Sequence, residues 1–126
     1  MEAANIRCLG AFSAAVGRGD WTAALALLSD DRSYAIYSGR EHPFRMAGSG
    51  RVEVDEGLRR NFGVLTFEEI VMESLAAQGD LVIAVFRQRG HWRHNGEGFD
   101  ERVMVEFRFR AGLIVAYRGW VVPYLP

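Results

Sequence analysis

The chain has 126 residues, of which 49% are hydrophobic and 25% charged, a balance typical of a soluble globular protein with one packed core. The formal net charge of −1 excludes a dominant basic face, so nucleic acid is not an expected partner. No segment approaches the roughly 20 consecutive apolar residues of a membrane-spanning helix, so no membrane partner is expected. We therefore predict a single domain over residues 1–126.

Cys8 is the only cysteine, so no internal disulfide can form and a reducing, cytoplasmic location is expected. It lies in an apolar helical pattern, where a small buried side chain is a better explanation than a nucleophile. The first ten residues carry neither a positive leader nor a long apolar run, which also favours the cytoplasm.

Two helices are predicted at the start of the chain. Residues 2–17 place apolar side chains near helical spacing, and the glycines that follow end this amphipathic helix. Asp20 can cap a second helix over residues 21–28, in which Trp21 and Leu25 share one face.

A strand, a loop and a third helix are predicted next. Residues 32–39, "RSYAIYSG", alternate as a short strand. Residues 39–51 are rich in glycine and indicate a loop, with a short extended piece at 44–47. A third helix is expected from Asp55, a candidate cap, to Phe62.

The second half of the chain has the alternation of long strands. In the third of them Val103, Val105, Phe107 and Phe109 point one way, and after the Ala111-Gly112 turn the chain continues through Leu113, Val115 and Tyr117. Together the four strands cover residues 66–77, 80–92, 99–110 and the run that follows the turn. This order predicts an α+β fold with the three helices on one face of a strongly curved antiparallel sheet.

The order of elements resembles the nuclear-transport-factor-two-like superfamily, and its SnoaL-like and ketosteroid-isomerase-like branches in particular. The resemblance rests on "GRGDWTAALALLSDD" (17–31), the third helix and "VEFRFRAGLIV" (105–115). It implies a cone-shaped α+β barrel with a hydrophobic pocket between sheet and helices. It implies no single activity, because this fold serves isomerases, cyclases, dehydratases, epoxide hydrolases and assembly domains.

The catalytic positions that the resemblance implies are apolar in this sequence. Ketosteroid isomerases use a tyrosine, a carboxylate base and a protonated acid, and the matching positions here are Phe12, Ile36 and Val105. The epoxide hydrolases of the superfamily carry an aspartate on the last strand where this chain has Gly119. Neither mechanism is predicted, and the sequence leaves open whether the chain is an enzyme.

Other polar groups are expected on the inward face. Tyr34 and Tyr117 are candidate catalytic donors or weak acids, Gln88 could orient a ligand, and His91 is a candidate base at the cone's mouth. The alternatives are a backbone hydrogen bond for each phenol and an exposed hairpin tip for His91. His42 could close over the pocket or lie in solvent.

The predicted ligand-binding residues are otherwise apolar: Phe12, Ile36, Leu58, Phe62, Phe86, Val105, Phe107 and Val121, together with Gln88. No metal is expected, because the two histidines of "HWRH" (91–94) lie on opposite faces of an extended segment. No organic cofactor is expected either.

These features predict a protein that binds a small, mostly apolar molecule, as a cofactor-independent isomerase, cyclase or dehydratase. The alternative is a non-catalytic ligand-binding or dimerisation module. A void of about 300 Å³ or more beside Phe86, Val105, Phe107 and Tyr117 would favour a ligand. A cone plugged by Phe12, Trp21 or Phe62 would argue against one.

The opposite face of the strands is expected to be charged and exposed. A tryptophan set among arginines also suits an interface, and relatives pair through this sheet face, so we predict a homodimer there. The residues concerned are Arg87, Arg89, Glu106, Arg108, Arg110, Arg118 and Trp120.

Overall fold

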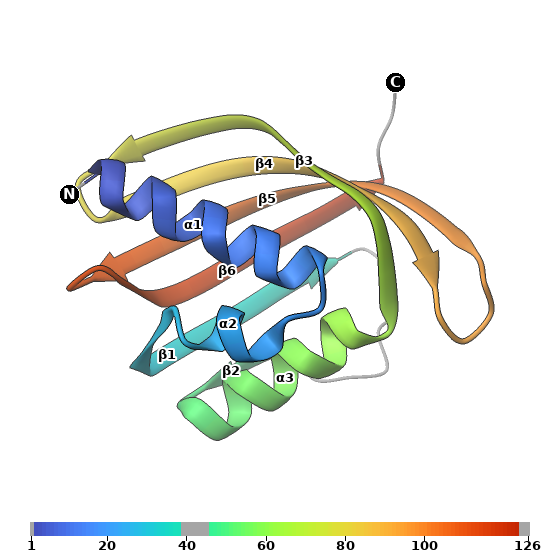
Figure 1. The fold of residues 1–126 in the computed structure, drawn as a ribbon, viewed down its shortest axis with the longest axis horizontal. Coiled ribbons are helices and arrows are strands. Elements are labelled where there is room, and N and C mark those ends of the chain that lie inside the picture. The colour runs from blue at the N-terminus through green and yellow to red at the C-terminus, as the bar shows by residue number, and fades with distance from the viewer. Residues whose placement is uncertain (1, 39–45, 124–126) are drawn as a thin grey trace.

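A computed structural model of the chain describes residues 2–38 and 46–123. Its elements, in chain order, are α1 (Glu2–Gly17), α2 (Trp21–Leu25), β1 (Leu28–Ser38), β2 (Ala47–Ser49), α3 (Arg51–Gly63), β3 (Leu65–Gln78), β4 (Leu81–Trp92), β5 (Gly98–Arg110) and β6 (Leu113–Pro123). The helices lie inside the curve of one sheet, which does not close (Figure 1). The predicted α+β architecture is confirmed.

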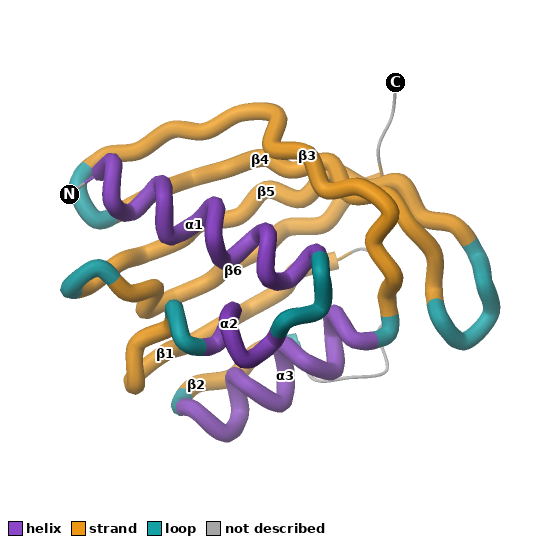
Figure 2. The backbone as a smooth tube through the Cα atoms, viewed as in Figure 1, coloured by secondary structure: helices purple, strands orange, loops and turns teal. Residues whose placement is uncertain are grey.

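The sheet has the strand order β2-β1-β6-β5-β4-β3. β3 to β6 form the predicted antiparallel series, whereas β1 pairs in parallel with β6. Two register shifts in β3, between Phe67 and Glu69 and between Met72 and Ser74, coincide with the arching of this edge strand over α1 (Figure 2).

The core follows the alternation predicted for β5. Val103, Val105, Phe107 and Phe109 are all buried, while Met104 between them is exposed. Leu9 and Phe12 of α1 pack onto this face from the helical side. Burying one such large side chain stabilises the fold by about 1.5–3 kcal/mol, so this face anchors α1 to the sheet.

The alternation is interrupted at the start of β6. Phe109 pairs with Ile114, but Arg108 pairs with Ala116, so Val115 is the extra residue of a bulge. Ile114 is therefore buried, and Leu113, predicted on the same face as Tyr117, is exposed.

The boundary between α2 and β1 differs from the prediction. Asp20 caps α2 as expected, since its side chain accepts a hydrogen bond from Ala23 N at 3.1 Å. The helix ends at Leu25 rather than at residue 28, because Leu28 already pairs with Ile114 of β6. Because β1 pairs with β6 from Leu28 onward, the strand begins at the residue where the helix was predicted to end.

The third helix starts earlier than predicted. α3 begins at Arg51, after Gly50 with a φ of 82°, so Asp55 is not its cap. Asp55 instead accepts a hydrogen bond of 2.6 Å from the buried guanidinium of Arg32 on β1. The same guanidinium donates to the carbonyl oxygens of Ser29 at 2.7 Å and Leu28 at 3.2 Å, which ties α3 to the start of β1.

The glycine-rich loop is described only in part. A short strand runs from Ala47 to Ser49. The extended piece predicted at 44–47 therefore overlaps with this strand only at Ala47. Residues 39–45, which include His42, lie outside the described residues. The proposed closing role of His42 stays a prediction.

Candidate functional site

The deep part of the cone is packed rather than hollow. Phe12 fills it, with its ring centroid 6.1 Å from that of Phe107 and 6.0 Å from that of Tyr117. The hollow left beside Phe86 and Val105 encloses only about 20 Å³. The void of about 300 Å³ considered from the sequence is not found there. These residues form core, and Phe12 is the side chain that plugs it.

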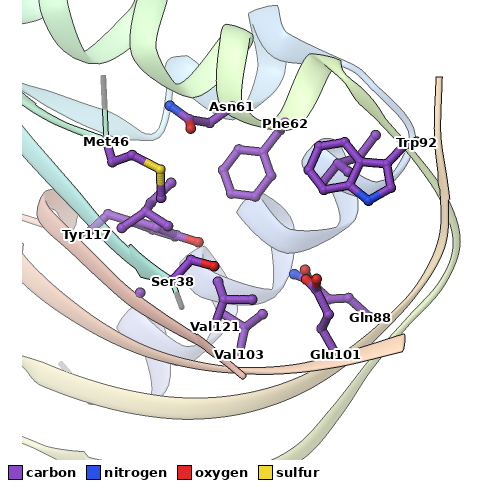
Figure 3. A pocket seen from close by; sticks show the side chains of 13 residues that line it. Ser38, Met46, Asn61, Phe62, Gln88, Trp92, Glu101, Val103, Tyr117 and Val121 are labelled. Carbon is purple, nitrogen blue, oxygen red and sulfur yellow. The ribbon is translucent and has the colours of Figure 1, made fainter. Parts of the chain in front are cut away.

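A second hollow opens further out, at the mouth of the cone (Figure 3). It encloses about 40 Å³, room for about three water molecules, and reaches about 480 Å³ with its opening to solvent included. Its lining consists of Ile36, Ser38, Met46, Asn61, Phe62, Leu65, Gln88, Trp92, Glu101, Val103, Tyr117, Gly119 and Val121. The inward face of β5 and β6 therefore forms part of the core in the deep part of the cone and lines the hollow at its mouth.

Two polar side chains lie side by side on the sheet wall of this hollow (Figure 3). Gln88 on β4 and Glu101 on β5 are direct partners in the sheet, and they are only 8% and 6% exposed. A few polar side chains in a mostly apolar lining can orient a bound molecule, so this pair makes the mouth the candidate site.

Sequence reasoning missed Glu101 as a pocket residue. It lies two residues before Val103 on β5, so strand alternation alone places it on the inward face. Trp92 was missed for a similar reason, since it lies four residues after Gln88 on the same face of β4.

Tyr117 brings a hydrogen-bond donor to the mouth. Its side chain is buried, and this burial raises the pKa of the phenol above its ordinary value, so the hydroxyl stays protonated at neutral pH. The ring lies over Gly119, where an added Cβ would be 3.5 Å from the Tyr117 hydroxyl. A neutral phenol in this position can donate to a carbonyl oxygen but cannot act as a base.

His91 is not at the mouth. Its side chain is exposed on the other face of β4, with Nδ1 3.2 Å from Glu68 Oε1. The expected position was wrong because Trp92, not His91, has the inward parity at the end of β4.

Tyr34 is buried against α3 rather than lining the mouth. A Cβ added at Gly57 would lie 2.0 Å from the Tyr34 hydroxyl, which shows how closely ring and helix pack. Leu58 is also a core residue. The structure therefore gathers Ile36, Phe62, Gln88, Tyr117 and Val121 at the mouth, and Phe12, Phe86, Val105 and Phe107 at depth.

Neither a cluster of metal-binding side chains nor a membrane-spanning helix is found among the described residues. Within residues 2–38 and 46–123, no three His, Cys, Asp or Glu side chains are grouped so that they could hold a metal ion. In the same ranges no helix has the length and apolar character needed to cross a membrane.

The fold is shared with many solved structures. An NTF2-like protein from Burkholderia xenovorans LB400 is 22% identical, with a TM-score of 0.77 over 97% of this chain and 92% of the other. A Bacillus subtilis protein named as a candidate isomerase is 17% identical, with a TM-score of 0.84 over 96% and 88%. An LEH-like epoxide hydrolase from M. tuberculosis is 21% identical, with a TM-score of 0.74 over 96% and 84%. At these identities the likeness concerns the fold alone.

The sequence comparisons define the family. A search of curated proteins gives no match. The model of the SnoaL-like domain matches residues 9–117, which is most of the chain. The protein is therefore a member of the SnoaL-like domain family, within the NTF2-like and ketosteroid-isomerase-like fold group.

Proposed function

We propose that this protein binds a small, mostly apolar carbonyl compound at the mouth of the cone and rearranges it by proton transfer. The reaction class would be that of a cofactor-independent isomerase, cyclase or dehydratase in the cytoplasm. The observation that carries the proposal is the buried carboxylate of Glu101 beside Gln88 in an otherwise mostly apolar hollow. A carboxyl group in such surroundings can serve as a general acid or base in a proton-transfer enzyme.

The geometry suggests a division of roles. Val103 and the Tyr117 hydroxyl both lie near Gly119, 3.7 Å and 3.5 Å from where its Cβ would be. Glu101 is two residues nearer the mouth, about 7 Å further along the strand. A small molecule that enters through the opening of the hollow would lie between the carboxylate and the phenol.

The proposed step needs no oxidant or reductant. Glu101 removes a proton from a carbon next to the carbonyl group, and the C–H electron pair forms the carbon–carbon double bond of an enolate. The hydroxyl of Tyr117 donates a hydrogen bond to the developing oxyanion, and the Gln88 amide can orient the substrate. Glu101 then returns the proton to another carbon, which completes an isomerisation. One donor to an oxyanion is typically worth 100-fold or more in rate.

The first experiment is a thermal-shift screen of steroids, terpenes, polyketide fragments and small aromatic acids. A ligand at 100 times its Kd should stabilise the fold by about 2.7 kcal/mol. Any hit would then be tested for turnover and for exchange of its acidic C–H protons with deuterium from solvent.

Glu101→Gln should then lower the exchange rate about 100-fold or more while ligand binding persists. The matched control is Glu97→Gln, because Glu97 is exposed on the hairpin just before β5. Equal rates in wild type and Glu101→Gln would exclude Glu101 as the proton carrier. A screen without hits would favour the non-catalytic alternative.

A second candidate function, a dimerisation module, is supported by the outer sheet face. Tyr37 and Trp120 stack there with ring centroids 5.4 Å apart, although they are 51% and 37% exposed. Met104, the partner of Trp120 on β5, extends this apolar patch. We propose a homodimer through this patch. Sedimentation at micromolar concentration should give a dimer for wild type and a monomer for Trp120→Glu, and a wild-type monomer would end the proposal.

A further inference from the structure

A separate hollow opens on the outside of the cone, between the end of α1 and the start of β3. It encloses about 200 Å³, more than the mouth does. Its lining includes Arg18, Trp21, Phe62, Phe67 and Arg93, and we call it the arginine cleft. The lining residues come from three separate segments of the chain, 16–21, 62–67 and residue 93, so no short motif in the sequence marks the cleft.

The two arginines give the cleft a positive charge. Arg93 is held in place, since its Nε lies 3.3 Å from Thr66 Oγ1 and its backbone N–H donates to Val64 O at 2.9 Å. Arg18 is exposed and has a loose ion pair with Asp20 at 3.5 Å. No Asp or Glu is among the described residues that line the cleft. Guanidinium groups that line a hollow are well suited to bind an oxyanion.

The floor of the cleft is aromatic. Trp21 stacks on Phe62 with centroids 5.9 Å apart and planes at 30°, and Phe67 lies 6.3 Å from Phe62. Phe62 and Leu65 also line the mouth, so the two hollows lie back to back with these side chains between them. An aromatic floor beneath two cations matches a ligand with a flat apolar body and an anionic end.

We propose that the arginine cleft binds an oxyanion attached to a flat apolar body, of the aromatic carboxylate class. The carboxylate would lie between Arg18 and Arg93, and the ring would pack on Trp21 and Phe62. This site does not depend on the proton-transfer function proposed for the mouth, because none of Gln88, Glu101 and Tyr117 lines it.

The proposal is tested by NMR titration of the full chain with three probes. Phenylacetate should bind, its neutral isostere phenylacetamide should bind at least tenfold more weakly, and inorganic phosphate should also bind more weakly. Arg93→Gln and Arg18→Gln should each weaken phenylacetate binding about tenfold or more, the usual effect of losing a hydrogen bond between charged groups. Arg118→Gln, an equal charge change on the outer sheet face, should leave the affinity unchanged.

Several results would overturn the proposal. Equal binding of phenylacetate and phenylacetamide would remove the role of the charge, and equal binding of phosphate would remove the role of the aromatic floor. Unchanged affinity in both Arg93→Gln and Arg18→Gln would exclude the cleft as the site. An equal loss in Arg118→Gln would show non-specific attraction. The Tm of every variant is measured beside the titration, and having two arginine variants keeps the test valid if one of them unfolds.

Discussion

Gln88 on β4 and Glu101 on β5 are direct partners across the sheet, and both side chains are more than nine-tenths buried at the mouth of the cone. A protein optimised only for stability would fill these positions with apolar side chains, as it does two and four residues deeper at Val103 and Val105. Proteins commonly give up stability in this way at functional sites. The pair therefore separates the polar part of the lining at the mouth from the apolar core on the same strand.

Gln88→Leu should stabilise the fold by about 0.5–2 kcal/mol, because it replaces a buried amide with an apolar side chain of similar size. The free energy of unfolding in urea measures the effect. Gln78→Leu, at the exposed end of β3, is the control and should change stability by less than about 0.5 kcal/mol. A loss of stability in Gln88→Leu would show that the amide has a structural role.

Asp55→Ala should destabilise the fold by about 3–5 kcal/mol, because it leaves the buried guanidinium of Arg32 without its carboxylate. Urea denaturation again gives the value. Asp30→Ala breaks the exposed pair with Arg51 and should cost about 1 kcal/mol or less. Equal costs in the two variants would contradict the structural role assigned to Arg32.

Gly57→Ala should destabilise the fold although alanine favours helices by about 1 kcal/mol over glycine. The new Cβ would lie 2.0 Å from the Tyr34 hydroxyl and 2.4 Å from its Cζ, so the buried ring would have to move. Gly63→Ala in the same helix is the matched control, since nothing lies within 4 Å of its Cβ position. The two variants should shift the Tm in opposite directions, and a rise in both would refute the close packing.

Tyr117 should make the stability of the protein fall at high pH. Burial raises the pKa of this phenol in the folded state, while in the unfolded chain it ionises near its ordinary value of about 10. The contribution of the neutral phenol to the free energy of unfolding is therefore fully present below a pH of about 10. It is lost as the pH rises further, by up to about 1.4 kcal/mol per pH unit. Tyr117→Phe should flatten this fall in urea titrations between about pH 9 and 11.5. Identical curves for both proteins would mean that Tyr117 ionises normally.

Sequence patterns were sufficient for the order of elements and for the faces of most strands. The alternation around Val105 and Phe107 has a period of two, and a strand has no other way to bury such residues on one side. The resemblance to SnoaL-like proteins rested on the same patterns, and the family match confirms it. The same alternation places Glu101 on the inward face, because it lies two residues before Val103 on β5.

Other features depend on contacts between distant segments. Whether the residues around Leu28 continue a helix or start a strand is decided by pairing with Ile114, 86 positions later. The bulge at Val115 changes the parity of β6, which no local pattern reveals. Elements of this kind are set by long-range pairing that overrides local propensity.

The sequence by itself determined the fold, because regular structure must place its apolar side chains with a fixed period. Tertiary structure alone decided where the cone is filled and where it is open. Phe12 on α1 closes the deep part onto Phe107, and Phe62 on α3 separates the mouth from the arginine cleft. Which volume a side chain fills depends on how helices sit over the sheet, and that is fixed by packing across the whole domain rather than by any local run of residues.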